Sequence, residues 1–265
     1  MYSPFRIAQK YFQYFITAAN GKGHGIHSPF VYDLIRNVLN DRTPYPAYKQ
    51  VENMRKLLMR DKTVIEIEDM GAGSSVNNSR QRSVASIARN AGKPKKWAQL
   101  LFRIVRRYSP MNIVELGTSL GISTSYMALA NIHARIITCE GSKAVAKLAR
   151  RNFEALHLQQ VYLAEGNFDA TLNNVLEQLP QVDLAFIDGN HRKEPTLRYF
   201  DQIVAKTHAA SIIILDDIHW SEEMESAWAT IKAHPSVRLT IDLFFFGLVF
   251  FNDDIKVKQH FTIRF

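Results

Sequence analysis

Apolar runs that end in an acidic or polar residue recur along the middle of the chain. The runs cover residues 113–115, 135–140, 161–167, 182–188 and 211–217. Their Ile, Leu and Val residues do not alternate with polar ones, which is typical of strands buried on both faces of a parallel sheet. Segments of helical length and periodicity separate the runs, at residues 123–132, 143–157, 169–179 and 193–207. The pattern therefore predicts an α/β protein.

The first hundred residues have a different pattern, which predicts a mainly helical N-terminal module. Apolar spacing of helical period covers residues 5–19, 30–39 and 48–59, and a short strand is expected at 62–68. The glycine-rich segment 69–75 is interpreted as a loop. We expect two domains, the helical module with a basic connecting region over residues 1–105 and the sheet domain over residues 106–265.

The end of the chain predicts a helix followed by more strands. The helix is expected at residues 222–232, with Trp228 in the core. Aromatic residues on both sides of Gly247 predict an antiparallel hairpin packed into the core, and residues 260–265 could add another strand.

Composition indicates in which cellular compartment the protein is expected. The single cysteine, Cys139, falls in a predicted strand, which indicates core packing and a reducing environment. No signal-peptide pattern is found in the first 20 residues, and the longest apolar run, at residues 243–251, is too short to span a bilayer. We expect a cytoplasmic protein with no membrane partner.

A glycine motif after the first strand predicts a nucleoside site. Glu115 is followed by Gly117 and Gly121, and Glu140 ends the next strand 23 residues after Gly117. An acid at that position accepts hydrogen bonds from ribose hydroxyls. The third glycine of a dinucleotide fingerprint is replaced by Thr124, which favours a ligand without a pyrophosphate. The alternative is a purely structural turn.

Carboxylates at the ends of the fourth and fifth strands suggest a second kind of chemistry. Asp188 ends one strand, Asp216 and Asp217 end the next, and His191 follows three residues after Asp188. Carboxylate oxygens suit a hard cation such as Mg²⁺, and a histidine suits a general base near neutral pH. The alternative is that Asp188 and Asp216 cap the helices that follow.

With these motifs, the chain resembles the class I S-adenosylmethionine-dependent methyltransferases over roughly residues 110–251. The strand-end acids and the Asp-Gly-x-His motif at 188–191 resemble the catechol-type metal-dependent O-methyltransferases and a related bacterial group. The resemblance implies a Rossmann-like sheet of seven strands in the order 3-2-1-4-5-7-6, with the last strand antiparallel. This chain departs from the family's pattern at His191, where a lysine base is usual, and at Asp217, where an asparagine is usual.

The resemblance also implies roles for individual residues. S-adenosylmethionine would be bound by the glycine-turn residues and by the acids and amide at the strand ends: Glu115, Gly117, Thr118, Ser119, Gly121, Glu140, Asn167 and Asp188. Asp188 and His191 would be the catalytic residues. Mg²⁺, if a metal is used, would be bound by Asp188, Asp216 and Asp217.

The net charge of +8 comes from one region. Residues 70–114 contain no acid but nine basic residues: Arg80, Arg82, Arg89, Lys93, Lys95, Lys96, Arg103, Arg106 and Arg107. This region could bind an anionic substrate, including RNA, or it could be a solvated helix face with a basic loop.

Together the patterns predict an S-adenosylmethionine-dependent methyltransferase that methylates a hydroxyl of a small molecule. Two alternatives stay open: an RNA-directed methyltransferase that uses the basic region 80–107, and a non-catalytic protein on a methyltransferase scaffold. Pairing of the N-terminal helices in a homodimer is a further open question.

Overall fold

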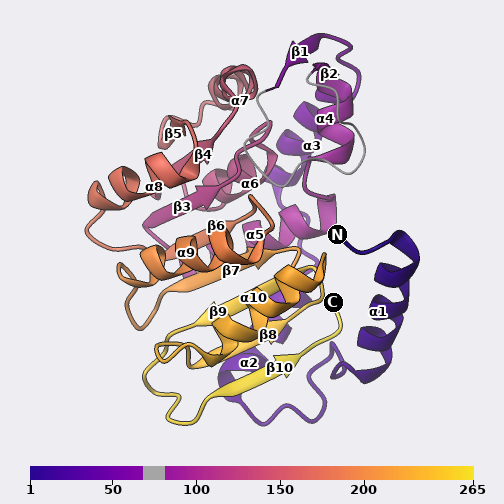
Figure 1. Cartoon of the computed structure of the whole chain (residues 1–265), viewed down its shortest axis with the longest axis vertical. Helices are drawn as coiled ribbons and strands as arrows, with labels where there is room; N and C mark the ends of the chain where they lie inside the picture. The colour runs from indigo at the N-terminus through magenta and orange to yellow at the C-terminus, as the bar shows by residue number, and fades with distance from the viewer. Residues whose placement is uncertain (68–80) are drawn as a thin grey trace. The chain divides into compact units, whose positions relative to one another are not determined.

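The computed structural model describes residues 1–67 and 81–265 (Figure 1). Its contacts divide the chain into two compact units, which we call unit 1 (residues 1–41 and 179–265) and unit 2 (residues 42–178). The expected domain boundary after residue 105 stays a prediction, and the segment 69–75 interpreted as a loop lies outside the described residues. Within the described ranges, no helix is both long and apolar enough to cross a membrane.

The main sheet has eight strands in the order β10-β8-β9-β7-β6-β3-β4-β5. This order confirms the predicted 3-2-1-4-5-7-6 arrangement and adds one edge strand. The strands are β3 (Asn112–Leu116), β4 (Arg135–Glu140), β5 (Val161–Glu165), β6 (Leu184–Ile187), β7 (Ile212–Asp216), β8 (Leu239–Asp242), β9 (Phe246–Phe250) and β10 (Gln259–Thr262).

In unit 2, β3, β4 and β5 are parallel neighbours. The helices of this unit are α3 (Pro46–Leu58), α4 (Val84–Asn90), α5 (Lys95–Tyr108), α6 (Ile122–Ala130), α7 (Lys143–Ala155) and α8 (Phe168–Glu177). A separate two-stranded antiparallel sheet is formed by β1 (Val64–Glu66) and β2 (Gln81–Ser83). The short strand expected near residues 62–68 is therefore confirmed as β1.

Helices α4 and α5 lie in the basic connecting region. Helix α5 has strong helical amphipathicity, with Leu100, Leu101 and Ile104 buried on one side and Arg106 and Arg107 exposed. Because the region has so many charges, its composition alone does not reveal this apolar stripe. The basic region is thus helical in part, and whether it binds an anionic substrate stays untested.

In unit 1, β6 and β7 are parallel, and β9 pairs antiparallel with both β7 and β8. The helices are α1 (Pro4–Thr17), α2 (Pro29–Leu34), α9 (Lys193–Val204) and α10 (Glu222–Ala233), and a short π-helix, η1 (Ile35–Leu39), continues α2. The predicted tail strand is confirmed as β10, which lies parallel to β8.

The aromatic residues of the hairpin are in the core, as expected, except for Phe245, which is half-buried. Phe246 is fully buried, and Trp228 is only 2% exposed. A Cβ on Gly247 would lie 2.8 Å from the Trp228 ring, so the missing side chain lets helix α10 pack directly on strand β9. Cys139 is also buried, in agreement with its expected packing role.

Candidate functional site

The predicted cofactor loop is a tight turn between β3 and α6, in unit 2. The backbone is left-handed at Gly117 (φ 104°), Ser119 (φ 49°) and Gly121 (φ 78°). The N–H groups of Gly117 and Thr118 both donate to the Cys139 carbonyl, at 3.0 and 3.1 Å. These bonds hold the turn against the end of β4, where Glu140 follows directly.

Glu115 is a fully buried carboxylate surrounded by hydroxyl donors. Ser123 and Thr138 donate to its two oxygens at 2.6 Å each, and Thr124 donates as well. Burial raises the pKa of Glu115 to about 7, and these hydroxyl hydrogen bonds oppose the rise. The described contacts of Glu115 are thus internal ones that tie β3 to the first turn of α6.

Thr118 belongs to the same polar chain. Its Oγ1 lies 2.6 Å from Oγ1 of Thr138, which in turn donates to Glu115. Only the glycine turn was visible in the sequence as a motif. The hydroxyl shell was missed because Thr138 comes from β4 and becomes a partner only when the strands pair.

Glu140 faces the glycine turn. Its carboxylate accepts hydrogen bonds from the backbone N–H of Ser119 at 2.8 Å and of Ser142 at 2.9 Å. Burial raises the pKa of Glu140 and outweighs the backbone hydrogen bonds, which act to lower it. Asn167 has a local role at the start of α8, where its side chain accepts from the N–H of Asp169 at 2.9 Å.

The acids at the ends of β6 and β7 gather in unit 1. The register pairs Ile187 with Leu215, so Asp188 and Asp216 come next on adjacent parallel strands. One ligand atom each of Asp188, His191 and Asp216 lies within 4.8 Å of the others. His191 Nε2 is 3.6 Å from Asp188 Oδ1. This trio offers two carboxylates and an imidazole to one point.

The helices that follow β6 and β7 are capped by other residues. The N-cap of α9 is Arg192 and that of α10 is Ser221, so the capping alternative for Asp188 and Asp216 is not borne out. The backbone is left-handed at His191 (φ 41°) and Asp217 (φ 53°). Asp217, a predicted ligand, lies outside the trio.

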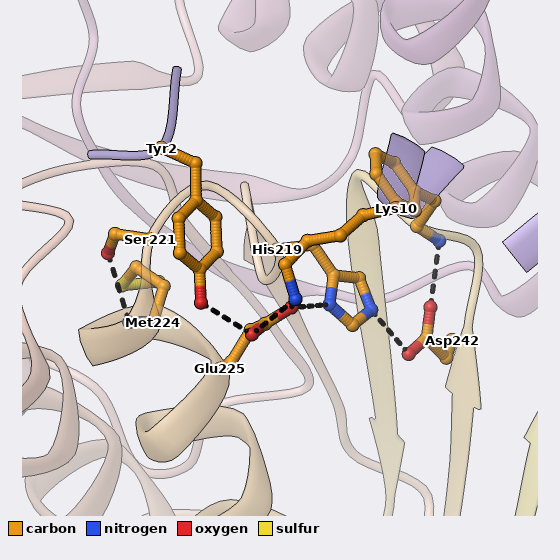
Figure 2. Close-up of polar contacts among 8 residues, drawn as sticks. Tyr2, Lys10, His219, Ser221, Met224, Glu225 and Asp242 are labelled. Carbon is orange, nitrogen blue, oxygen red and sulfur yellow. Dashed lines mark hydrogen bonds and ion pairs between the residues drawn. The ribbon is translucent and has the colours of Figure 1, made fainter. Parts of the chain in front are cut away.

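Unit 1 holds a second polar cluster, centred on His219. Its Nδ1 is hydrogen-bonded to Glu225 at 2.9 Å and its Nε2 to Asp242 at 2.8 Å (Figure 2). Burial lowers the pKa of His219, but the two carboxylates outweigh it and the net shift is upward. Phe244 stacks on the ring at 5.1 Å. This histidine is therefore held by its neighbours.

Comparison with known proteins agrees with the fold and the motifs. Residues 114–218 match the family model described as a methyltransferase domain. A catechol O-methyltransferase from Niastella koreensis is 31% identical over 136 residues, which make up 50% of this chain. The chain spans 58% of the length of that relative.

Solved structures extend the likeness of fold to most of the chain. A SAH-bound methyltransferase from Podospora anserina has a TM-score of 0.59 at 15% identity, covering 85% of this chain and 97% of that one. The O-methyltransferase from Bacillus cereus in complex with SAH has a TM-score of 0.52 at 19% identity, covering 83% and 97%.

The sheet order and these structures define an α/β protein with the Rossmann-like methyltransferase fold. Residues 114–218 match the methyltransferase-domain family model, and over 136 residues the chain is similar to a catechol O-methyltransferase.

Proposed function

We propose that this protein transfers a methyl group from S-adenosylmethionine to a hydroxyl of a small molecule. The observation that carries the proposal is the trio of Asp188, His191 and Asp216 at the ends of two adjacent parallel strands. The turn at Gly117 would account for cofactor binding, but it gives no reason for two carboxylates and an imidazole to lie together. A hydroxyl acceptor that must lose a proton before methylation would give such a reason.

The cofactor is assigned to the loop and strand ends of unit 2. Gly117, Ser119 and Gly121 would approach its methionine portion, and Glu140 would accept from its ribose. Glu115 and Thr118, also predicted cofactor residues, would contribute by holding the turn. Asn167 would lie near the adenine. The left-handed backbone at both glycines supports this assignment, since a turn of this kind lets the main chain come close to a ligand.

The two carboxylates of the trio, Asp188 and Asp216, fit a hard divalent cation such as Mg²⁺, which prefers oxygen ligands. Asp217 is proposed as a further ligand, and the imidazole of His191 is assigned another role. When bound, such a cation would lower the pKa of an acceptor hydroxyl and orient its oxygen. Asp188 is also assigned to the cofactor and to catalysis.

His191 is proposed as the group that takes the acceptor's proton. Its contact with Asp188 supports this role, because a neighbouring carboxylate stabilises the imidazolium that forms when the proton is taken up. The chain's remaining task is to hold acceptor and methyl group in line, which is largely an effect of orientation.

The substitution Asp216→Asn tests the proposal, with Asp254→Asn, at an exposed acid, as the matched control. Because Asp216 is assigned to the cation, Mg²⁺ should raise the unfolding temperature of the control protein but not of Asp216→Asn. Turnover of a catechol-type acceptor should fall by at least about 100-fold, with little change in S-adenosylmethionine affinity measured by calorimetry. Loss of cofactor affinity in Asp216→Asn would instead assign that acid to the fold of the cofactor site.

Partner and location belong to the same proposal. A small-molecule acceptor follows from the relatives named above, and a cytoplasmic location suits the single buried cysteine. Tight RNA binding that weakens steeply with salt, together with turnover independent of metal, would favour the RNA-directed alternative. Absence of any S-adenosylmethionine binding would favour the non-catalytic one.

A further inference from the structure

The outward side of helix α1 is a stripe of exposed aromatic and aliphatic residues. Phe5 is 80% exposed, Phe12 65%, Phe15 48% and Ile16 59%. Their spacing places them along one face of the helix. We call these four residues the α1 stripe. Exposed apolar residues normally occur singly on a soluble protein, and contiguous patches mark interaction surfaces.

Contacts of the opposite side of α1 and of Tyr2, just before the helix, hold α1 against the rest of unit 1, so the stripe points outward. Lys10 forms an ion pair with Glu225 at 2.9 Å, and the Tyr2 hydroxyl donates to the same carboxylate at 2.8 Å (Figure 2). Farther along the helix, Tyr14 is buried and donates to the carbonyl of Ile263. The exposure of the stripe therefore belongs to a docked helix rather than to a frayed end.

Basic residues border the stripe at both ends. Arg6 follows Phe5 in α1 and is exposed like it. The end of the chain lies beside the residues after α1, because Ala19 pairs with Ile263 and the Arg264 N–H donates to the Ala19 carbonyl at 3.1 Å. The Arg264 guanidinium lies 5.0 Å from the centre of the Phe15 ring. Positive charge thus borders the apolar surface directly.

The size of the stripe argues against a second copy of the chain as its occupant. With about 200 Å² for a whole aromatic side chain, the exposed parts of the stripe come to roughly 500 Å². Two such stripes face to face would bury roughly 1,000 Å², which is below the roughly 1,200 Å² of stable protein interfaces. Pairing would also bring the two sets of basic residues together. An anionic surface would neutralise them.

We propose that α1 binds the surface of an anionic lipid membrane, with the α1 stripe in the headgroup region. Aromatic residues beside basic ones are the composition of helices that lie in this interface. We expected no membrane partner because no apolar run can span a bilayer. A helix lying in the interface needs no such run, and α1 is already formed and held in place before it binds.

Sedimentation of the full-length protein with vesicles tests the proposal. We expect binding to vesicles of phosphatidylcholine with about 30% phosphatidylserine, weak binding to phosphatidylcholine alone, and weaker binding at high salt. The double substitution Phe5→Ser and Phe12→Ser should lower the partition coefficient at least about tenfold, since both rings are mostly exposed in the free protein and buried when bound. Arg264→Gln should reduce the preference for phosphatidylserine.

Leu57→Ser is the matched control, because Leu57 is 69% exposed but lies on α3. It should bind like the original protein, and circular dichroism should show that all variants are folded. Equal vesicle binding by the double variant and the control would overturn the proposal. The proposal would also be overturned if the original protein bound neither kind of vesicle. If light scattering then shows a dimer that the double variant loses, the stripe binds a second copy instead.

Discussion

The turn at Gly121 allows a sharp test of how the cofactor loop is built. Gly121 has φ +78°, and a Cβ added there would lie 2.8 Å from Cζ of Phe153, with Cε1 closer still. Phe153 is only 5% exposed and sits on α7, so its ring has little room to move. We therefore predict that Gly121→Ala is strongly destabilising.

The magnitude follows from two separate costs. A left-handed backbone costs a residue with a side chain about 1–2 kcal/mol, and overpacking a buried site costs about 1–3 kcal/mol. Alanine also restricts the unfolded chain, which returns about 0.4–1 kcal/mol. Gly121→Ala should therefore lower the free energy of unfolding by about 2–4 kcal/mol.

Gly25 separates the two costs, because it has the same φ of +78° and nothing within 4 Å of an added Cβ. Gly25→Ala should cost only about 1 kcal/mol or less. Phe153→Leu replaces the aromatic ring that the new Cβ of Gly121→Ala would contact with a smaller side chain. In urea unfolding followed by circular dichroism, the double variant Gly121→Ala with Phe153→Leu should lose less stability than the sum of the two single variants.

Two results would refute this reasoning. If Gly121→Ala and Gly25→Ala cost the same, the contact with Phe153 has no energetic weight. If the effects of Gly121→Ala and Phe153→Leu simply add, the cost comes from the backbone alone. S-adenosylmethionine affinity provides a link to function, and we expect it to fall in Gly121→Ala because the turn also carries Ser119.

Two further predictions concern pH. The native pKa of Glu115, about 7, lies above its ordinary 4.5. The free energy of unfolding should therefore fall by about 3 kcal/mol as pH rises between these two values. Urea unfolding should show no such fall in Glu115→Gln, and an equal fall in that variant would rule out Glu115 as the cause. The raised pKa of His219 stabilises the fold fully below its ordinary value and ceases to do so as pH rises through the native value. Thermal unfolding should therefore separate Asp242→Asn from the original protein at pH 6 and much less at pH 9; a constant gap would contradict this.

The positions of most strands and helices followed from local patterns. Residues 135–140 and 212–216 are strands because continuous Ile and Leu runs must be buried on both faces. The hairpin around Gly247 was recognisable from its aromatic flanks. Helices α4 and α5 were harder to see, because nine basic residues nearby dominate the composition while the apolar stripe of α5 is visible only by its helical period.

The trio at the ends of β6 and β7 was predictable in part. Parallel neighbours bring their carboxyl ends to one edge, so Asp188 and Asp216 were expected near each other, and their ligand atoms do lie close together. Asp217 follows Asp216 in sequence but is not in that trio, since a positive φ turns the chain there. The direction of a side chain after a strand end depends on the turn, which residue types alone do not specify.

The sequence by itself determined the order of strands and helices, the glycine turn and the acids that end the strands, because each depends on neighbours a few residues apart. The tertiary structure decided which hydroxyls surround Glu115, which carboxylates hold His219, and that Phe5 and Phe12 point away from the body. Each of these depends on groups brought together from distant parts of the chain. Burial and charge act through space, so they are settled only when the strands and helices pack.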